Sequence, residues 1–104
     1  MPNIMPKSIA PEDATSPKRN WSIIKILDKG EEESMAVALG KWNGVPVIGL
    51  RWNGTAENPI GNPQSRGLAT WFVLEQGRYT EAIISSLPLA TQKLVREFIP
   101  AASA

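Results

Sequence analysis

The sequence contains no cysteine and no histidine among its 104 residues. Disulfide bonds, thiolate zinc sites, cysteine or histidine nucleophiles and Ser-His-Asp triads are therefore excluded by composition alone. A secreted domain of this size often depends on disulfides. The lack of cysteine thus favours a cytoplasmic protein.

Long apolar runs and an excess of one charge are also missing. No apolar segment approaches the roughly 20 residues that span a bilayer, and Pro2, Pro6 and Pro11 interrupt the region where a signal peptide would be apolar. The 11 Lys and Arg residues nearly balance the 10 Asp and Glu residues, giving a net charge of +1. We expect a soluble protein in which any basic site is local.

The sequence offers no set of residues suited to catalysis. Glu31, Glu32 and Glu33 are consecutive, so their side chains point in diverging directions and do not converge on one ion. The glycine-flanked segment 61–67 lacks the Gly-Lys-Ser or Gly-Lys-Thr ending of a phosphate-binding loop and precedes a strand rather than a helix. We therefore predict a protein that is not an enzyme and uses no metal or cofactor.

What the sequence does contain is enough for one core, since 42% of its residues are hydrophobic. Residues 1–20 include four prolines and show no sustained apolar period, which predicts a flexible N-terminal tail. A single domain is expected over 21–99, followed by a C-terminal tail over 100–104.

The clearest local signal is the Asn43-Gly44 pair, which lies between two apolar runs. Asn-Gly suits the positive φ angles of a type I′ turn. It predicts a β-hairpin with strands at about 34–42 and 45–52. The two-residue loop sets the register, so Trp42 lies opposite Val45 and Ala36 opposite Arg51.

The other elements follow from residue type and spacing. Residues 21–27 and 68–74 are rich in β-branched and aromatic residues and predict two more strands, with a long loop over 53–67. A helical pattern runs over about 78–99 and is broken near Pro88. The sequence therefore predicts an α+β fold, a four-stranded antiparallel sheet followed by a C-terminal helical segment.

The predicted register gives the hairpin two different faces. The larger side chains form a face that a helix would cover, the core face: Met35, Val37, Leu39, Ile48, Leu50 and Trp52, with Lys41 and Pro46 at its turn end. The other, the small-residue face, carries Ala36, Ala38, Gly40, Trp42, Val45, Val47, Gly49 and Arg51.

The small-residue face predicts close approach of another molecule, because alanine and glycine gain little from packing on an exposed sheet. With Trp42 near one end and Arg51 near the other, a single-stranded nucleic acid would find a stacking platform and a phosphate partner. Two alternatives remain open. The face could pack on another sheet or a dimer mate, with Trp42 as a turn-capping hydrophobe and Arg51 in a surface ion pair. Trp21, Trp52 and Trp71 are expected in the core or an interface.

The stretch from Ala38 to Trp52, with its aromatic-Asn-Gly turn, resembles the transcriptional positive cofactor four family of single-stranded-DNA-binding proteins over about residues 21–87. The resemblance implies a non-catalytic homodimer that presents its sheets to unpaired DNA in transcription or genome maintenance. It places Lys41 and Trp42 beside the hairpin turn and Arg51 near the end of the third strand. Thr70-Trp71 replaces a Lys-Gly pair of that family, and Arg66 would supply the charge from the loop.

Two functional hypotheses follow. The first is a dimeric single-stranded DNA- or RNA-binding domain that uses Lys41, Trp42, Arg51 and Arg66. The second is a small bacterial protein-interaction or regulatory module without nucleic-acid binding, docking through the small-residue face or the 53–67 loop.

Overall fold

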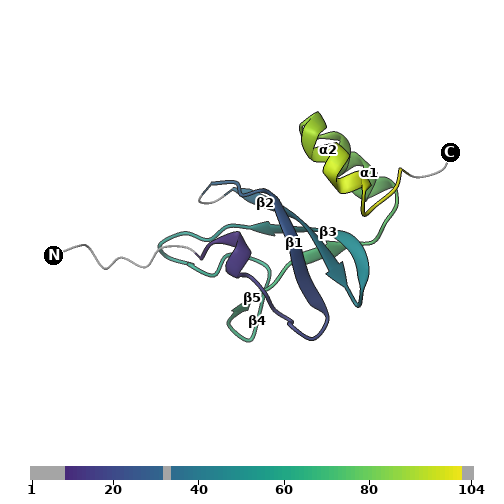
Figure 1. Ribbon diagram of the computed structural model, residues 1–104. Helices are drawn as coiled ribbons and strands as arrows, with labels where there is room; N and C mark the ends of the chain where they lie inside the picture. Colours follow the sequence, from purple (N-terminus) through teal and green to yellow (C-terminus); the bar gives the residue numbers. More distant parts are fainter. Residues whose placement is uncertain (1–8, 32–33, 102–104) are drawn as a thin grey trace.

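The computed structural model describes residues 9–31 and 34–101 and has an α+β fold, as predicted (Figure 1). Its main sheet has four antiparallel strands in the order β1-β2-β3-β6. Their bounds are β1 Trp21–Asp28, β2 Met35–Trp42, β3 Val45–Trp52 and β6 Phe72–Leu74. A two-stranded sheet pairs β4 Gln64–Ser65 with β5 Leu68–Ala69. The helices are the 3-10 helix η1 Pro11–Asp13, α1 Arg78–Ser85 and α2 Leu89–Arg96.

The central hairpin forms in the predicted register. Trp42 pairs with Val45 and Ala36 with Arg51, with unbroken pairing between them. Asn43 and Gly44 have φ angles of +51° and +83°, as a type I′ turn requires. The local turn chemistry alone was enough to fix these two strands.

The predicted strand over 68–74 is wrong as a single element, because its two halves belong to different sheets. Arg66 and Gly67 both have positive φ and form a second tight turn, so Leu68 pairs with Ser65 in the β4–β5 hairpin. The chain then crosses over, and Phe72–Leu74 pairs with β3. A short local pairing therefore takes the first half of the apolar run.

The C-terminal segment forms two helices, which are separated near Pro88 where the sequence predicts a break. Pro88, with its fixed φ and no N–H group, lies immediately before α2, and α1 ends at Ser85. Arg96 of α2 forms a two-pronged ion pair with Glu81 of α1, with N···O distances of 2.6 and 2.8 Å. Among the described elements, no helix has the length and apolar character needed to cross a bilayer.

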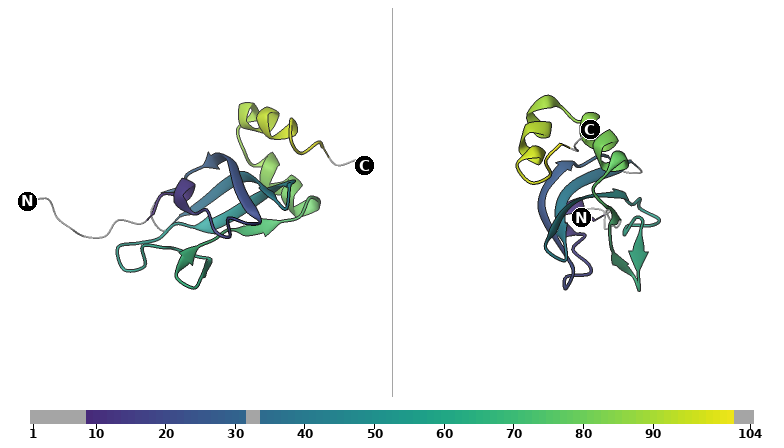
Figure 2. Two further views of the ribbon diagram at one scale, coloured as in Figure 1. Left: turned by 60° about the horizontal axis from the view of Figure 1, so that its bottom comes forward. Right: turned by 90° about the vertical axis from the view of Figure 1, so that its right-hand side faces the viewer.

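The main sheet has a core on each face, whereas the sequence predicted one. The two α-helices lie together on one side of the sheet (Figure 2). On one side the two α-helices cover the predicted core face, and the buried residues are Leu39, Ile48, Ile84, Leu87, Val95 and Ile99. On the other side the small-residue face is covered by the chain before β1 and around β5, and the buried residues are Ala14, Trp21, Ala36, Ala38, Val47, Ala69 and Trp71.

The predicted flexible tail over 1–20 is wrong for its described part, residues 9–20. Ala14 is fully buried, Pro11 is buried, and the Ile9 amide donates to the Pro59 carbonyl at 2.9 Å. Residues 1–8 lie outside the described residues, as do 102–104 of the expected C-terminal tail. The segment 9–20 is thus a layer of the fold.

Candidate interaction surfaces

Over Gly40 and Gly49 the small-residue face is closed by the protein's own tryptophans, so the prediction that another molecule reaches this part is wrong. Its turn end is open, with 51% of Val45 exposed. A methyl group built on Gly40 would lie 2.3 Å from Trp21 Cη2, and one on Gly49 would lie 3.1 Å from the same atom. The rings of Trp21 and Trp71 lie over this face with centroids 5.8 Å apart. Alanine and glycine occupy this face because larger side chains would collide with the rings of Trp21 and Trp71.

The indole of Trp71 also fastens the N-terminal layer. Its Nε1 donates a buried hydrogen bond to the Ala14 carbonyl at 2.6 Å, across 57 residues of sequence. Trp21 and Trp71 therefore fulfil the expectation of core tryptophans. Trp52 lies outside the core, with 52% of it exposed, and its expected position in an interface stays a prediction.

Arg51, the expected phosphate partner, is an internal residue with only 2% of its surface exposed. Its guanidinium donates to the backbone carbonyls of Thr70 and Ile60, and it lies 5.9 Å from the centroid of the Trp71 ring. Burial lowers the pKa of Arg51, yet a guanidinium stays charged at neutral pH. Arg51 joins β3 to the 53–67 loop and to the crossover before β6.

The other three predicted site residues do not gather around Arg51. Lys41 is exposed and pairs with Pro46, on the face of the hairpin opposite to Trp42. Trp42 is half-buried and packs against the core under the small-residue face. Arg66 is exposed at the turn of the β4–β5 hairpin. The structure thus places the four residues in four different environments.

An apolar recess, here called the aromatic recess, opens on the helix side of the sheet at the end that the helices leave uncovered. Its volume is about 420 Å³. It is lined by Met35, Leu50, Arg51, Trp52, Asn62, Pro63, Phe72 and Leu74. Met35 pairs with Trp52, and Leu50 with Phe72, so these side chains stand together on one face of three neighbouring strands.

The exposure of this recess follows from element lengths. An eight-residue strand extends about 26 Å, whereas an eight-residue helix extends about 12 Å. The helix pair covers Leu39 and Ile48 but leaves Met35, Trp52 and Phe72 with 37%, 52% and 62% of their surfaces exposed. The alternation of side chains along the strands placed Met35 and Trp52 on the correct face of the sheet. It could not show how far along the strands the two helices extend.

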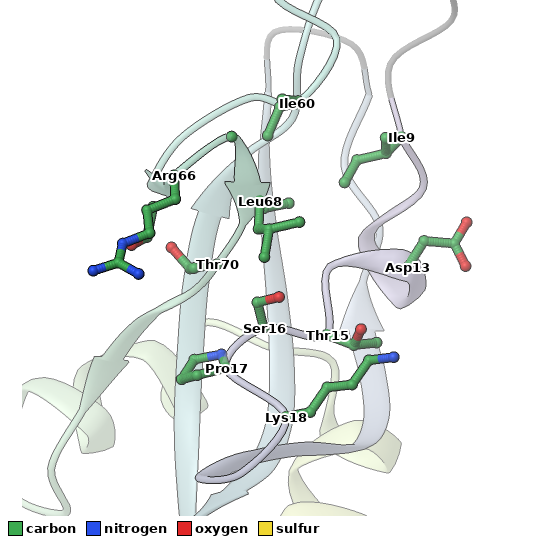
Figure 3. A pocket seen from close by; sticks show the side chains of 13 residues that line it. Ile9, Asp13, Thr15, Ser16, Pro17, Lys18, Ile60, Arg66, Leu68 and Thr70 are labelled. Atoms are coloured by element: carbon green, nitrogen blue, oxygen red, sulfur yellow. The ribbon is translucent and has the colours of Figure 1, made fainter.

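A second hollow, here called the hairpin groove, lies between the N-terminal layer and the β4–β5 hairpin (Figure 3). Its volume is about 710 Å³. Lys18 comes from the chain just before β1, and Arg66 comes from the tip of the hairpin. The hydroxyl side chains of the lining are Thr15, Ser16, Ser65 and Thr70. Lys18 and Arg66 are distant in sequence, and only the fold brings them to one groove.

Within the described residues, no cluster of three or more Asp or Glu side chains could hold a metal ion. Comparisons of the chain with family models, with curated proteins and with solved structures find no match. The candidate surfaces must therefore be interpreted from their own chemistry.

Proposed function

We propose that this protein is a non-enzymatic protein-interaction module whose aromatic recess receives an apolar anchor side chain of a partner protein. The observation that carries the proposal is the exposure of Trp52 and Phe72 side by side with Met35 on one sheet face. Exposed apolar patches of this kind commonly mark interaction sites. Tryptophan is also one of the residue types enriched among binding hot spots.

The energy available at the recess is substantial. An enclosed aromatic side chain buries about 150–250 Å², so exposures of 52% for Trp52 and 62% for Phe72 leave roughly 100 Å² of each open to solvent. Covering both would contribute about 5 kcal/mol at 25 cal/mol per Å². This is an upper value, from which the entropy lost on association must be subtracted.

The shape and polarity of the recess favour a different protein over a second copy of this chain. Two identical hollows facing each other across a two-fold axis would enclose empty space, whereas a projecting leucine or phenylalanine of a partner fills one hollow. The homodimer expected from sequence remains a prediction, which sedimentation equilibrium of the purified chain can test.

Nucleic-acid binding at the hairpin also remains a prediction, but the positions of the predicted residues now give it less support. Arg51 is engaged by two backbone carbonyls, and Lys41 and Trp42 lie on opposite faces. The aromatic recess has no lysine in its lining, and its arginine is the buried Arg51. A phosphate backbone needs accessible cations, so an apolar protein side chain suits this recess better.

Site-specific photo-crosslinking in the native host tests the proposal. A benzoylphenylalanine at position 72 should give a discrete protein adduct, identified by mass spectrometry, that survives nuclease treatment. The same group at Tyr79, which is 71% exposed on α1, is the matched control and should not give that adduct. The Trp52→Ser substitution should reduce the position-72 adduct several-fold.

The competing outcomes are distinguishable. Equal protein adducts at positions 72 and 79, or none at 72, would contradict the proposal. An adduct that nuclease removes would favour nucleic-acid binding, and an adduct with twice the chain's mass would favour the homodimer.

A further inference from the structure

We infer that the hairpin groove is a second binding site, independent of the aromatic recess, and that its ligand is an acidic peptide segment with aliphatic side chains. The inference rests on Lys18 and Arg66 lining the same hollow from two different segments, with their charged ends pointing in opposite directions, beside an aliphatic surface (Figure 3). No residue of this site lines the aromatic recess.

The cations of the groove are available for a ligand. In the part of the chain that the structure describes, the ion pairs are Lys29 with Glu12 and Arg96 with Glu81, so neither Lys18 nor Arg66 is paired with a carboxylate. Both cations are exposed, and they come from the two different walls of the groove (Figure 3). Asp13 is the acidic residue of the described lining, so a net positive charge remains.

The rest of the lining indicates what kind of anion fits. Ile9, Ile60 and Leu68 supply an aliphatic surface, and 58% of Leu68 is exposed. An isolated leucine with this exposure would be ordinary, but here it belongs to the same groove as two unpaired cations. A ligand with carboxylates next to aliphatic side chains matches both features.

The choice of a peptide over a nucleic acid follows from the aromatic content. Bases of single strands bind mainly by stacking on aromatic side chains. The thirteen lining residues of the groove include no tryptophan, tyrosine or phenylalanine. Hydroxyl groups of Thr15, Ser16 and Thr70 instead offer hydrogen bonds to peptide N–H and C=O groups.

Fluorescence anisotropy with the full chain tests the inference. The probe is a labelled hexapeptide of alternating glutamate and leucine, compared with its lysine-leucine counterpart and with labelled oligothymidylate. We expect the acidic peptide to bind in preference to both and to weaken as salt is raised.

Substitutions locate the site without disturbing the fold. Arg66→Asn removes the charge while keeping a residue that tolerates the left-handed conformation, φ +52°. Lys18→Gln removes the other charge. Each should weaken the acidic peptide about two- to fivefold, as expected for an exposed charge contact, and Leu68→Ser should weaken it similarly. Lys93→Gln, at an exposed lysine of α2, is the matched control and should change nothing.

Three results would overturn the inference. They are equal binding of the acidic and basic peptides, unchanged affinity in both Arg66→Asn and Lys18→Gln, and tighter binding of oligothymidylate that the same two substitutions weaken. The last result would assign the groove to nucleic acid. None of them bears on the crosslink at position 72, so this inference and the proposed function can fail separately.

Discussion

Removing the guanidinium of Arg51 should destabilise the fold rather than only weaken a ligand contact. The side chain is buried, and it is the donor to the Ile60 and Thr70 carbonyls. These two carbonyls belong to the 53–67 loop and to the crossover before β6. Without Arg51, both segments lose a side-chain contact to β3, so that the loop is held there by the backbone pairing of Trp52 with Asn62. The Trp71 ring also loses a cation 5.9 Å from its centroid.

The magnitude follows from these contacts. A hydrogen bond from a charged donor contributes about 1.5–3 kcal/mol, and a desolvated cation–π contact about 1–2 kcal/mol. Relief of the guanidinium's own desolvation offsets part of the loss. We therefore expect Arg51→Met, which keeps most of the volume, to cost about 3 kcal/mol, and Arg51→Ala, which adds a cavity, about 4–5 kcal/mol. Arg51→Lys should fall near 2 kcal/mol, because an ammonium lacks the planar fork that reaches both carbonyls.

Urea unfolding followed by tryptophan fluorescence measures these differences, since Trp71 is part of the affected core. Lys41→Ala, at an exposed lysine on the same hairpin, is the control and should change stability by less than about 0.5 kcal/mol. If Arg51→Ala were as stable as the parent chain within about 1 kcal/mol, the buried position of Arg51 would be refuted. A stable Arg51→Ala variant that failed only in oligonucleotide binding would restore Arg51 as a surface phosphate ligand.

Three further predictions test the packing that closes the sheet. Gly40→Ala should destabilise the protein by about 3 kcal/mol, clearly more than Gly49→Ala. The reason is that a methyl group at Gly40 meets neighbouring atoms at 2.3 Å, and one at Gly49 only at 3.1 Å. Equal thermal midpoints of the two variants would contradict this packing. Deletion of residues 1–16 should cost about 3 kcal/mol by removing the acceptor of the Trp71 hydrogen bond and the apolar cover around it, whereas deletion of residues 1–8 leaves that acceptor in place. Arg96→Gln should cost about 1 kcal/mol and make stability less sensitive to salt, because the Glu81 pair is partly exposed; an unchanged salt dependence would argue against the pair in solution.

The fold was largely predictable where local chemistry decides it. Asn43-Gly44 admits few conformations other than a type I′ turn, and the turn then fixes eight cross-strand pairs of β2 and β3. Pro88 likewise cannot lie in the interior of a helix without breaking or kinking it, and it stands at the start of α2. The segment 68–74 shows the limit of such reasoning. Its apolar residues suit a strand, but Arg66-Gly67 creates a competing local hairpin that takes Leu68 and Ala69.

The candidate site was less predictable, because alternation along a strand assigns a side chain to a face but not to a neighbour. Arg51 was placed correctly on the small-residue face and then interpreted as a surface cation. The structure buries it because the 53–67 loop and Trp71 fold over that face. Trp52 was placed correctly on the core face and interpreted as buried. It is exposed because the helices end short of it.

The amino-acid sequence by itself determined the composition limits, the hairpin register, the break at Pro88 and the two contrasting faces of the sheet. These depend on backbone conformations that neighbouring residues set. Only the tertiary structure decided which elements cover each face of the sheet. Trp21 and Trp71 lie over the small-residue face, and two short helices cover part of the core face. Coverage depends on contacts between residues distant in sequence, and these contacts leave the aromatic recess and the hairpin groove open.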